Sequence, residues 1–270
     1  MRTVPNLIFA TLVGLMSSAS AWASGDGAIP NPTTSWNATW NEVLLELWAI
    51  GILFGVAAIY LLIRYRAKSP DDVGTAKKLT MGQALAWSLV PAALFLAVDF
   101  LLAGKGWSLW NIQRTVPENA MEIRVTASQW AFTYEYPNGV EISSTERDED
   151  ADLFSQEIMD GDMVVPVGQP IVLRMTADDV IHSFGLTDYR LKEDIMPGRV
   201  TYLWFIPTDP LVSKVVCVEF CGTNHAQMFN RVVAVPQGKY DAWLAVKKEQ
   251  AMLDDAKKAA PQLARADNIQ

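Results

Sequence analysis

Histidine and cysteine are scarce in this chain of 270 residues, which contains two of each. Two cysteines cannot form a disulfide framework, and a bond between Cys217 and Cys221 would close a loop too short to constrain the unfolded chain strongly. The chain has no C-x-x-C-H motif, which excludes a covalently attached c-type haem. Two histidines are also too few for a protein that binds a multi-histidine catalytic metal cluster itself.

Basic residues are scarce in the second half of the chain. Residues 117–270 carry 24 acidic and 14 basic side chains, a net charge of −10. Nucleic-acid binding depends on lysine and arginine contacts to phosphates, so this balance argues against nucleic acid as a partner. The acids are concentrated between residues 141 and 162, where Arg147 is the one basic residue. Two interpretations stay open, a solvated loop or an acidic surface that steers a basic partner.

Long apolar runs occur near the N-terminus. Residues 1–23 have the charged start, apolar stretch and small-residue cleavage site of a secretory signal peptide. Residues 43–63 and 82–104 are each long enough to cross a bilayer as a helix. Glu46 and Asp99 lie near the ends of these two runs, and we interpret them as interfacial acids rather than parts of a proton path.

The charges between the two apolar runs predict how the chain is oriented in the membrane. The loop at 64–81 carries more basic than acidic side chains, and such loops face the cytoplasm. Residues 24–42 and everything after residue 104 are then expected on the periplasmic side. The sequence thus predicts a two-pass membrane protein with an external domain.

Residues 117–237 alternate short apolar segments with turn residues. The segments are rich in Val, Ile, Tyr, Phe and Trp, and clusters such as Pro137-Asn138-Gly139 separate them. This spacing predicts an all-β domain, either a sandwich or a barrel. Residues 238–270 are expected to form a C-terminal helix and tail, with the helix at 238–258 and disorder after Pro261.

Three of the four cysteine and histidine side chains lie in one short segment. Cys217, Cys221 and His225 lie within twelve residues that end at Met228, and His182 is the one other histidine. Thiolates, imidazoles and thioethers are the ligands that copper prefers. The cysteines, His225 and Met228 are also spaced so that they would line one face of a helix and could simply pack in a core. The valines before Cys217 favour a strand instead, and the Gly-Thr-Asn cluster that follows Cys221 would break a helix.

Several metal sites could use these residues. A structural zinc site would leave Met228 without a role, and a single type-1 copper needs one thiolate rather than two. A copper chaperone with a C-x₃-C pair is a further alternative, although such proteins are not usually all-β. Two sulfurs can also bridge two copper ions with one histidine on each, and this arrangement uses every one of these ligands.

The segment from Cys217 to Met228 resembles the CuA loop, C-x-E-x-C-x₃-H-x₂-M, of subunit II of haem–copper cytochrome c oxidases. Four other segments are similar to the same family: Asp178–Phe184, Asp194–Arg199, Gln129–Tyr136 and Trp87–Pro91. The resemblance implies a cupredoxin-like β-sandwich or barrel that follows two transmembrane helices.

The resemblance also implies the metal ligands. Cys217 and Cys221 would bridge two coppers, His182 and His225 would cap them, and Met228 would be an axial ligand. The cofactor would then be binuclear copper A.

Further roles follow from the same resemblance. Glu219 would offer its carbonyl oxygen to copper and its carboxylate to a magnesium ion shared with subunit I. Trp130 would receive the electron from cytochrome c. The docking face for cytochrome c would be acidic and include Asp178, Asp179, Glu141, Glu146 and Asp148.

The resemblance implies an electron-transfer subunit of a terminal respiratory oxidase in the bacterial inner membrane, which passes electrons to haem in catalytic subunit I for reduction of O₂ to water. Two features depart from the family. Ala131 and Phe132 follow Trp130 where the family usually has Tyr-Trp, and residues 81–86 lack the glutamates that mark the mouth of a proton channel in mitochondrial-type members. The CuA subunit of a related nitric oxide reductase therefore stays an alternative.

Overall fold

The computed structural model describes residues 29–73, 78–147 and 155–266. The predicted signal peptide at 1–23 and the predicted docking residue Asp148 lie outside the described residues. The chain divides into a helical unit that ends at Arg114 and a second unit that contains residues 31–33 and the chain from Thr115 onward.

Among its described residues, the helical unit contains two long helices, α2 (Pro32–Arg64) and α3 (Met81–Arg114). Asn31 caps α2, because its Oδ1 atom accepts the Thr33 N–H at 3.0 Å, and Pro32 takes the first helical position. Thr80 and Gln83 form a reciprocal capping box at the start of α3. Both helices therefore begin at residues whose side chains satisfy free backbone N–H groups.

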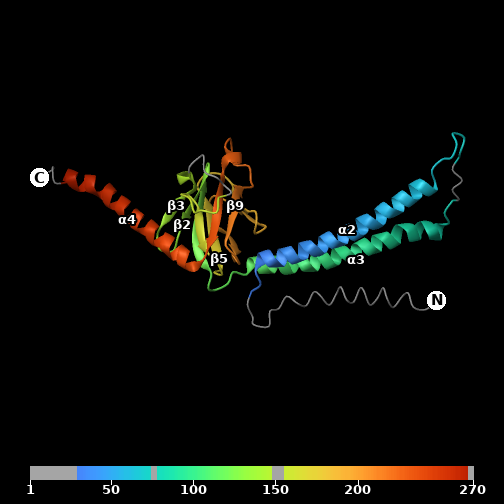
Figure 1. The fold of residues 1–270 in the computed structure, drawn as a ribbon, viewed down its shortest axis with the longest axis horizontal. Coiled ribbons are helices and arrows are strands. Elements are labelled where there is room, and N and C mark those ends of the chain that lie inside the picture. The colour runs from blue at the N-terminus through green and yellow to red at the C-terminus, as the bar shows by residue number, and fades with distance from the viewer. Residues whose placement is uncertain (1–28, 74–77, 148–154, 267–270) are drawn as a thin grey trace. The chain divides into compact units, whose positions relative to one another are not determined.

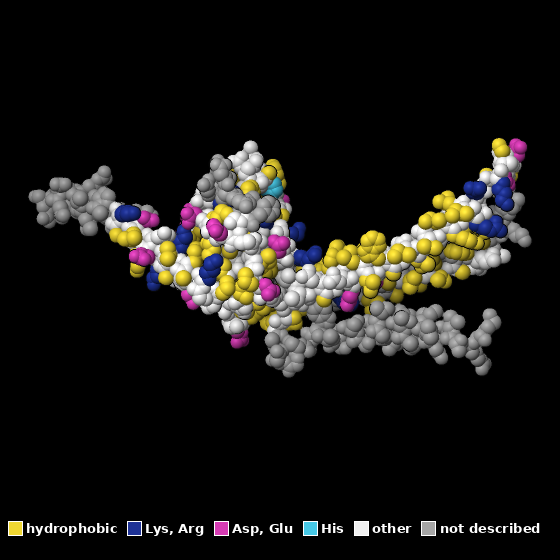
Figure 2. Space-filling model, in the orientation of Figure 1, with side chains coloured by type: hydrophobic (Ala, Val, Ile, Leu, Met, Phe, Trp, Pro, Cys, Tyr) yellow, Lys and Arg dark blue, Asp and Glu magenta, His cyan; other side chains and the backbone are white. Residues whose placement is uncertain are grey.

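Both helices are long and apolar enough to cross a membrane. Their 33 and 34 residues correspond to a length of about 50 Å, whereas a hydrocarbon core is roughly 30 Å thick. Each helix therefore extends past its apolar run at 43–63 or 82–104. Hydrophobic side chains cover much of their visible surface (Figure 2), and an ion pair between Lys105 and Glu42 joins the two helices.

The described part of the second unit contains two five-stranded sheets and the C-terminal helix (Figure 1). The first sheet has the order β3-β2-β1-β5-β8 and consists of β1 (Met121–Ser128), β2 (Ala131–Glu135), β3 (Glu141–Ser143), β5 (Ile171–Ala177) and β8 (Thr201–Phe205). The second has the order β4-β10-β9-β6-β7 and consists of β4 (Met163–Pro166), β6 (His182–Leu186), β7 (Leu191–Ile195), β9 (Leu211–Cys217) and β10 (Phe229–Val235). The β1–β5 and β4–β10 pairs are parallel, and the other strand pairs are antiparallel.

The core lies between the sheets and is formed by alternating residues of the strands. In β1, Ile123, Val125 and Ala127 are buried while the residues between them are not. Phe184 of the second sheet packs edge-on against Phe132 of the first, with ring centroids 5.2 Å apart. The predicted all-β sandwich is confirmed, and its second sheet carries the residues of the predicted metal segment at the ends of adjacent strands.

Helix α4 (Gln237–Ala266) follows the last strand. Tyr240 is buried, and Trp243 packs edge-on against Tyr136 with ring centroids 5.3 Å apart. The helix continues past Pro261, where the sequence led us to expect disorder. Ala259, Ala260, Ala264 and Ala266 have high helix propensity, which favours helix on both sides of this proline.

Candidate metal centre

The ligand loop, residues 217–228, connects β9 to β10. Cys217 is the last residue of β9, His225 opens the short 3₁₀ helix η3 (His225–Gln227), and Met228 directly precedes β10. The Cys217 N–H donates to the Met228 carbonyl at 3.0 Å and closes the loop at its base. His182 begins β6, which pairs with β9 so that Phe184 lies opposite Cys217. Strand pairing therefore brings the distant histidine to the ligand loop.

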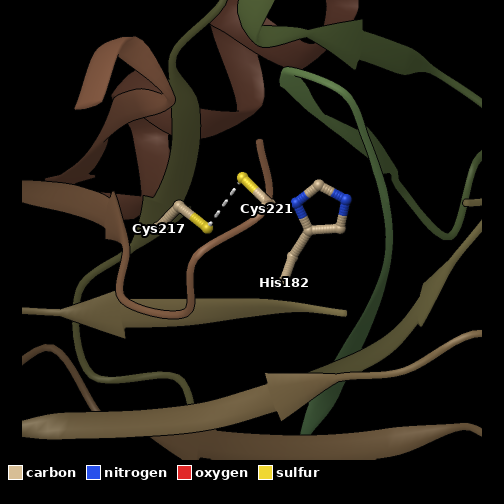
Figure 3. Close-up of side chains that lie close together, drawn as sticks. All are labelled: His182, Cys217 and Cys221. Carbon is tan, nitrogen blue, oxygen red and sulfur yellow. Dashed lines mark hydrogen bonds between the residues drawn. The ribbon is translucent and has the colours of Figure 1, made fainter. Parts of the chain in front are cut away.

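The sulfur and nitrogen atoms of this region converge. One ligand atom each of His182, Cys217 and Cys221 lies within 4.8 Å of the others (Figure 3). The two Sγ atoms are 3.7 Å apart, well beyond the roughly 2.05 Å of a disulfide bond, and both thiols are free. The structure thus brings two thiols and an imidazole together in one group.

The remaining two predicted ligands adjoin this group. Nδ1 of His225 lies 3.5 Å from the Cys221 sulfur. Sδ of Met228 lies 3.8 Å from the same sulfur and 3.2 Å from Nδ1 of His182. All five predicted side chains are therefore linked by contacts between potential ligand atoms.

Four of the five predicted ligands are shielded from water, and His225 is half-buried. His182 is fully buried, and Cys217, Cys221 and Met228 each expose less than a tenth of their surface. Burial, together with the neighbouring Cys217 thiol, raises the pKa of the Cys221 thiol to about 12. This thiol is therefore protonated at neutral pH, and a metal ion that binds it must displace the proton.

Asp179 orients the buried histidine. Its Oδ1 atom lies 2.8 Å from Nε2 of His182, and because a carboxylate only accepts, Nε2 carries the proton. Nδ1 is then free to bind a metal on the side of the thiols. Desolvation acts to raise the pKa of Asp179, but hydrogen bonds from His182 and from the Val180 and Gln129 N–H groups hold it below its usual value.

The contact between Asp179 and His182 was missed in the sequence, which suggested docking alone for this acid. The contact could have been suggested by the position of Asp179, three residues before the candidate ligand His182. Carboxylates commonly accept a hydrogen bond from the second ring nitrogen of a metal-binding histidine.

Trp130 lies beside the ligand loop. A Cβ atom on Gly222 would lie 3.2 Å from Cζ2 and 3.3 Å from Nε1 of this indole, so the loop approaches the ring closely. Gly222 has a φ of +126°, which other residues rarely adopt. The predicted electron-accepting residue and the predicted ligand loop are therefore in close proximity.

Glu219 lies in the loop between the two cysteines. Its carbonyl oxygen is 3.2 Å from Sγ of Cys217, and its side chain is exposed. The main-chain oxygen therefore faces the thiols while the carboxylate is accessible to another ligand or partner.

The acidic residues of the second unit fall into different environments. Glu141, Glu146 and Asp178 are exposed. Asp162 is fully buried and forms an ion pair with the equally buried Arg231. We had grouped Asp162 with the surface acids of residues 141–162, because a run of acidic residues in the sequence does not show which of them is buried.

Residues 121–235 match the family described as cytochrome c oxidase subunit II, periplasmic domain. The chain is 30% identical over 225 residues to cytochrome c oxidase subunit 2 of Cereibacter sphaeroides, with 75% of this chain and 72% of the relative covered. The chain belongs to the cytochrome c oxidase subunit 2 family. It is also 27% identical over 232 residues to the alternative cytochrome c oxidase subunit 2 of Bradyrhizobium diazoefficiens, with 80% and 82% covered.

A similar crystal structure is that of the periplasmic domain of subunit II of cytochrome oxidase of Bradyrhizobium japonicum. It is 31% identical to this chain, and the match covers 50% of this chain and 99% of that domain with a TM-score of 0.46. Family membership confirms the resemblance found in the sequence. This subunit II therefore combines two apolar helices with a CuA-type domain.

Proposed function

We propose that this subunit carries electrons from cytochrome c, through a binuclear copper centre, to haem in the catalytic subunit of a respiratory oxidase that reduces O₂ to water. The observation that carries the proposal is the pair of buried thiols 3.7 Å apart, together with the two histidine nitrogens near them. Nδ1 of His225 lies beside the Cys221 sulfur, and Nδ1 of His182 lies beside the Met228 sulfur. A structural zinc site gives no role to this thioether.

The donor set fits copper by its chemistry, since it consists of soft sulfur atoms and imidazole nitrogens. Cys217 and Cys221 would hold the copper pair through their sulfur atoms, His182 and His225 through imidazole nitrogens, and Met228 through its thioether. The carbonyl of Glu219 would complete the set. When bound, the copper pair supplies a one-electron carrier whose charge is shared between two ions.

The protein contributes rigidity and exclusion of water. Antiparallel pairing anchors Cys217 to β6, and the hydrogen bond to the Met228 carbonyl fixes both ends of the loop. Asp179 fixes the tautomer and ring orientation of His182. A site whose ligands are held in place needs little rearrangement when its charge changes.

Trp130 is proposed as the residue through which electrons reach the centre. Its support is the close approach of the indole to Gly222, next to the ligand Cys221. Replacement by phenylalanine tests this role, because phenylalanine keeps an apolar ring but removes the indole. We expect Trp130→Phe to slow electron uptake from reduced cytochrome c with the copper content unchanged, and an unaltered rate would contradict the assignment.

The exposed acids Glu141, Glu146, Asp178 and Asp179 are proposed, with Asp148, to attract a basic cytochrome c. Attraction between exposed charges is screened by salt, so the association rate should fall steeply as ionic strength rises. The exposed carboxylate of Glu219 is proposed as a ligand for magnesium shared with subunit I. The two apolar helices would hold the subunit in the bacterial inner membrane beside that partner, with the copper domain on the periplasmic side.

The experiment that tests the proposed function is a copper count on the purified full chain, combined with electron paramagnetic resonance. Two coppers that share one unpaired electron are expected. A single exchangeable copper would favour a chaperone instead, and zinc alone would favour a structural site. Cys217→Ser is expected to lose the shared-electron signal, whereas Ser213→Ala, which changes the same strand away from the ligands, should keep it.

A further inference from the structure

Gln129 connects the two segments that carry the predicted ligands. Its backbone N–H donates to Oδ2 of Asp179 at 2.7 Å, and the other oxygen of that carboxylate binds His182. Its side-chain Nε2 donates to the carbonyl oxygen of Cys221 at 2.8 Å. One residue thus links the segment of the buried histidine to the ligand loop.

The same residue lies against Gly222. A Cβ atom there would be 2.9 Å from Nε2 of Gln129, in addition to its close approach to Trp130. Gln129 and Trp130 therefore pack together on the one loop position that has no side chain. A hydrogen bond that holds the Cys221 carbonyl also holds the adjoining Gly222 against the indole.

We propose that Gln129 is a positioning residue, which keeps the Cys221–Gly222 segment in contact with Trp130 and thereby sets the rate at which electrons reach the copper ligands. Gln129 itself need not contact copper or cytochrome c. The inference rests on the proposed function, because it assigns electron uptake to Trp130.

The first test needs neither copper nor electron transfer. In the copper-free full chain, alkylation of the buried Cys221 by iodoacetamide requires the loop to open locally. Loss of one hydrogen bond should raise the open population, and with it the alkylation rate, by about two- to tenfold. Mass spectrometry would follow Cys221 in Gln129→Met, which keeps the side-chain length, and in Gln129→Glu, which lacks the donor.

A matched control is Gln169→Met. The Gln169 side chain also donates one hydrogen bond to a backbone carbonyl, that of Asn119, at 2.6 Å. This variant should leave the alkylation rate of Cys221 unchanged. If both Gln129 variants also match the parent chain, Gln129 does not hold the loop and the inference is wrong, whatever the protein's function.

The second test measures electron uptake from reduced cytochrome c in the copper-loaded oxidase complex. Gln129→Met should slow uptake by about two- to tenfold, and should have no further effect when Trp130 is already phenylalanine, because residues that act through one contact are not additive. Equal slowing in both backgrounds would show that Gln129 does not act through Trp130. A parent complex that takes no electrons from cytochrome c would instead contradict the proposed function, and the alkylation result would still report on the loop.

Discussion

The buried ion pair between Arg231 and Asp162 lies directly beyond the metal segment, and its removal is expected to destabilise the β-domain strongly. The guanidinium donates to both carboxylate oxygens, at 2.9 and 2.5 Å, and also to the carbonyls of Ser155 and Glu157. Both charged side chains are fully buried. Asp162→Asn keeps the shape but leaves the arginine charge without a counter-ion.

The magnitude follows from burial. Removal of one partner from a buried pair costs about 3–5 kcal/mol, because the remaining charge cannot be solvated. A surface pair contributes about 0–1 kcal/mol. Asp160 provides the comparison, since it pairs with Lys247 at 2.7 Å while 71% of its side chain is exposed. Asp160→Asn should therefore cost less than about 1 kcal/mol.

Urea denaturation of the purified chain, followed by tryptophan fluorescence, would measure both variants. The expected result is a large fall in the denaturation midpoint for Asp162→Asn and a small one for Asp160→Asn. Equal midpoints for the two variants would refute the reasoning from burial. The double replacement Asp162→Leu with Arg231→Met should recover part of the lost stability, since it leaves no charge unpaired but removes the donors to the Ser155 and Glu157 carbonyls.

Two further predictions concern the metal centre and the response to pH. Asp179→Asn should weaken copper binding by about 10–100-fold in competition with a chelator, because the oriented His182 loses its carboxylate, while the exposed Asp178→Asn should bind copper as the parent does. Burial raises the pKa values of Tyr134 and Tyr136 far above the ordinary value of about 10. These tyrosines are therefore neutral in the folded state when the unfolded chain has begun to ionise, so stability is fully present below about pH 10 and falls as the pH rises further. Denaturation midpoints between pH 9 and 11 would show this fall, which should be shallower in Tyr136→Phe, and a midpoint independent of pH would contradict it.

The sequence alone determined the general architecture and predicted the candidate ligands. Apolar runs of bilayer length and short alternating segments are local patterns, and they predicted the two long helices and the all-β domain. The ligand set was also readable, because the chain contains so few cysteines and histidines that four of the five candidates could be named without knowing the fold. The family pattern then assigned each of them a role.

The tertiary structure alone decided which residues support these ligands. Gln129 forms hydrogen bonds with Cys221, 92 residues away in the sequence, and with Asp179, 50 residues away. Arg231 pairs with Asp162, which is 69 residues away. No local periodicity reports such pairs. The contact between Gln129 and Asp179 depends on the register of β1 with β5, which places Ala127 opposite Ala177. The contact between Arg231 and Asp162 depends on the register of β4 with β10, which places Met163 opposite Val232. A shift of one residue in either register would turn alternate side chains to the opposite face of the sheet, so these contacts exist only in the assembled sandwich.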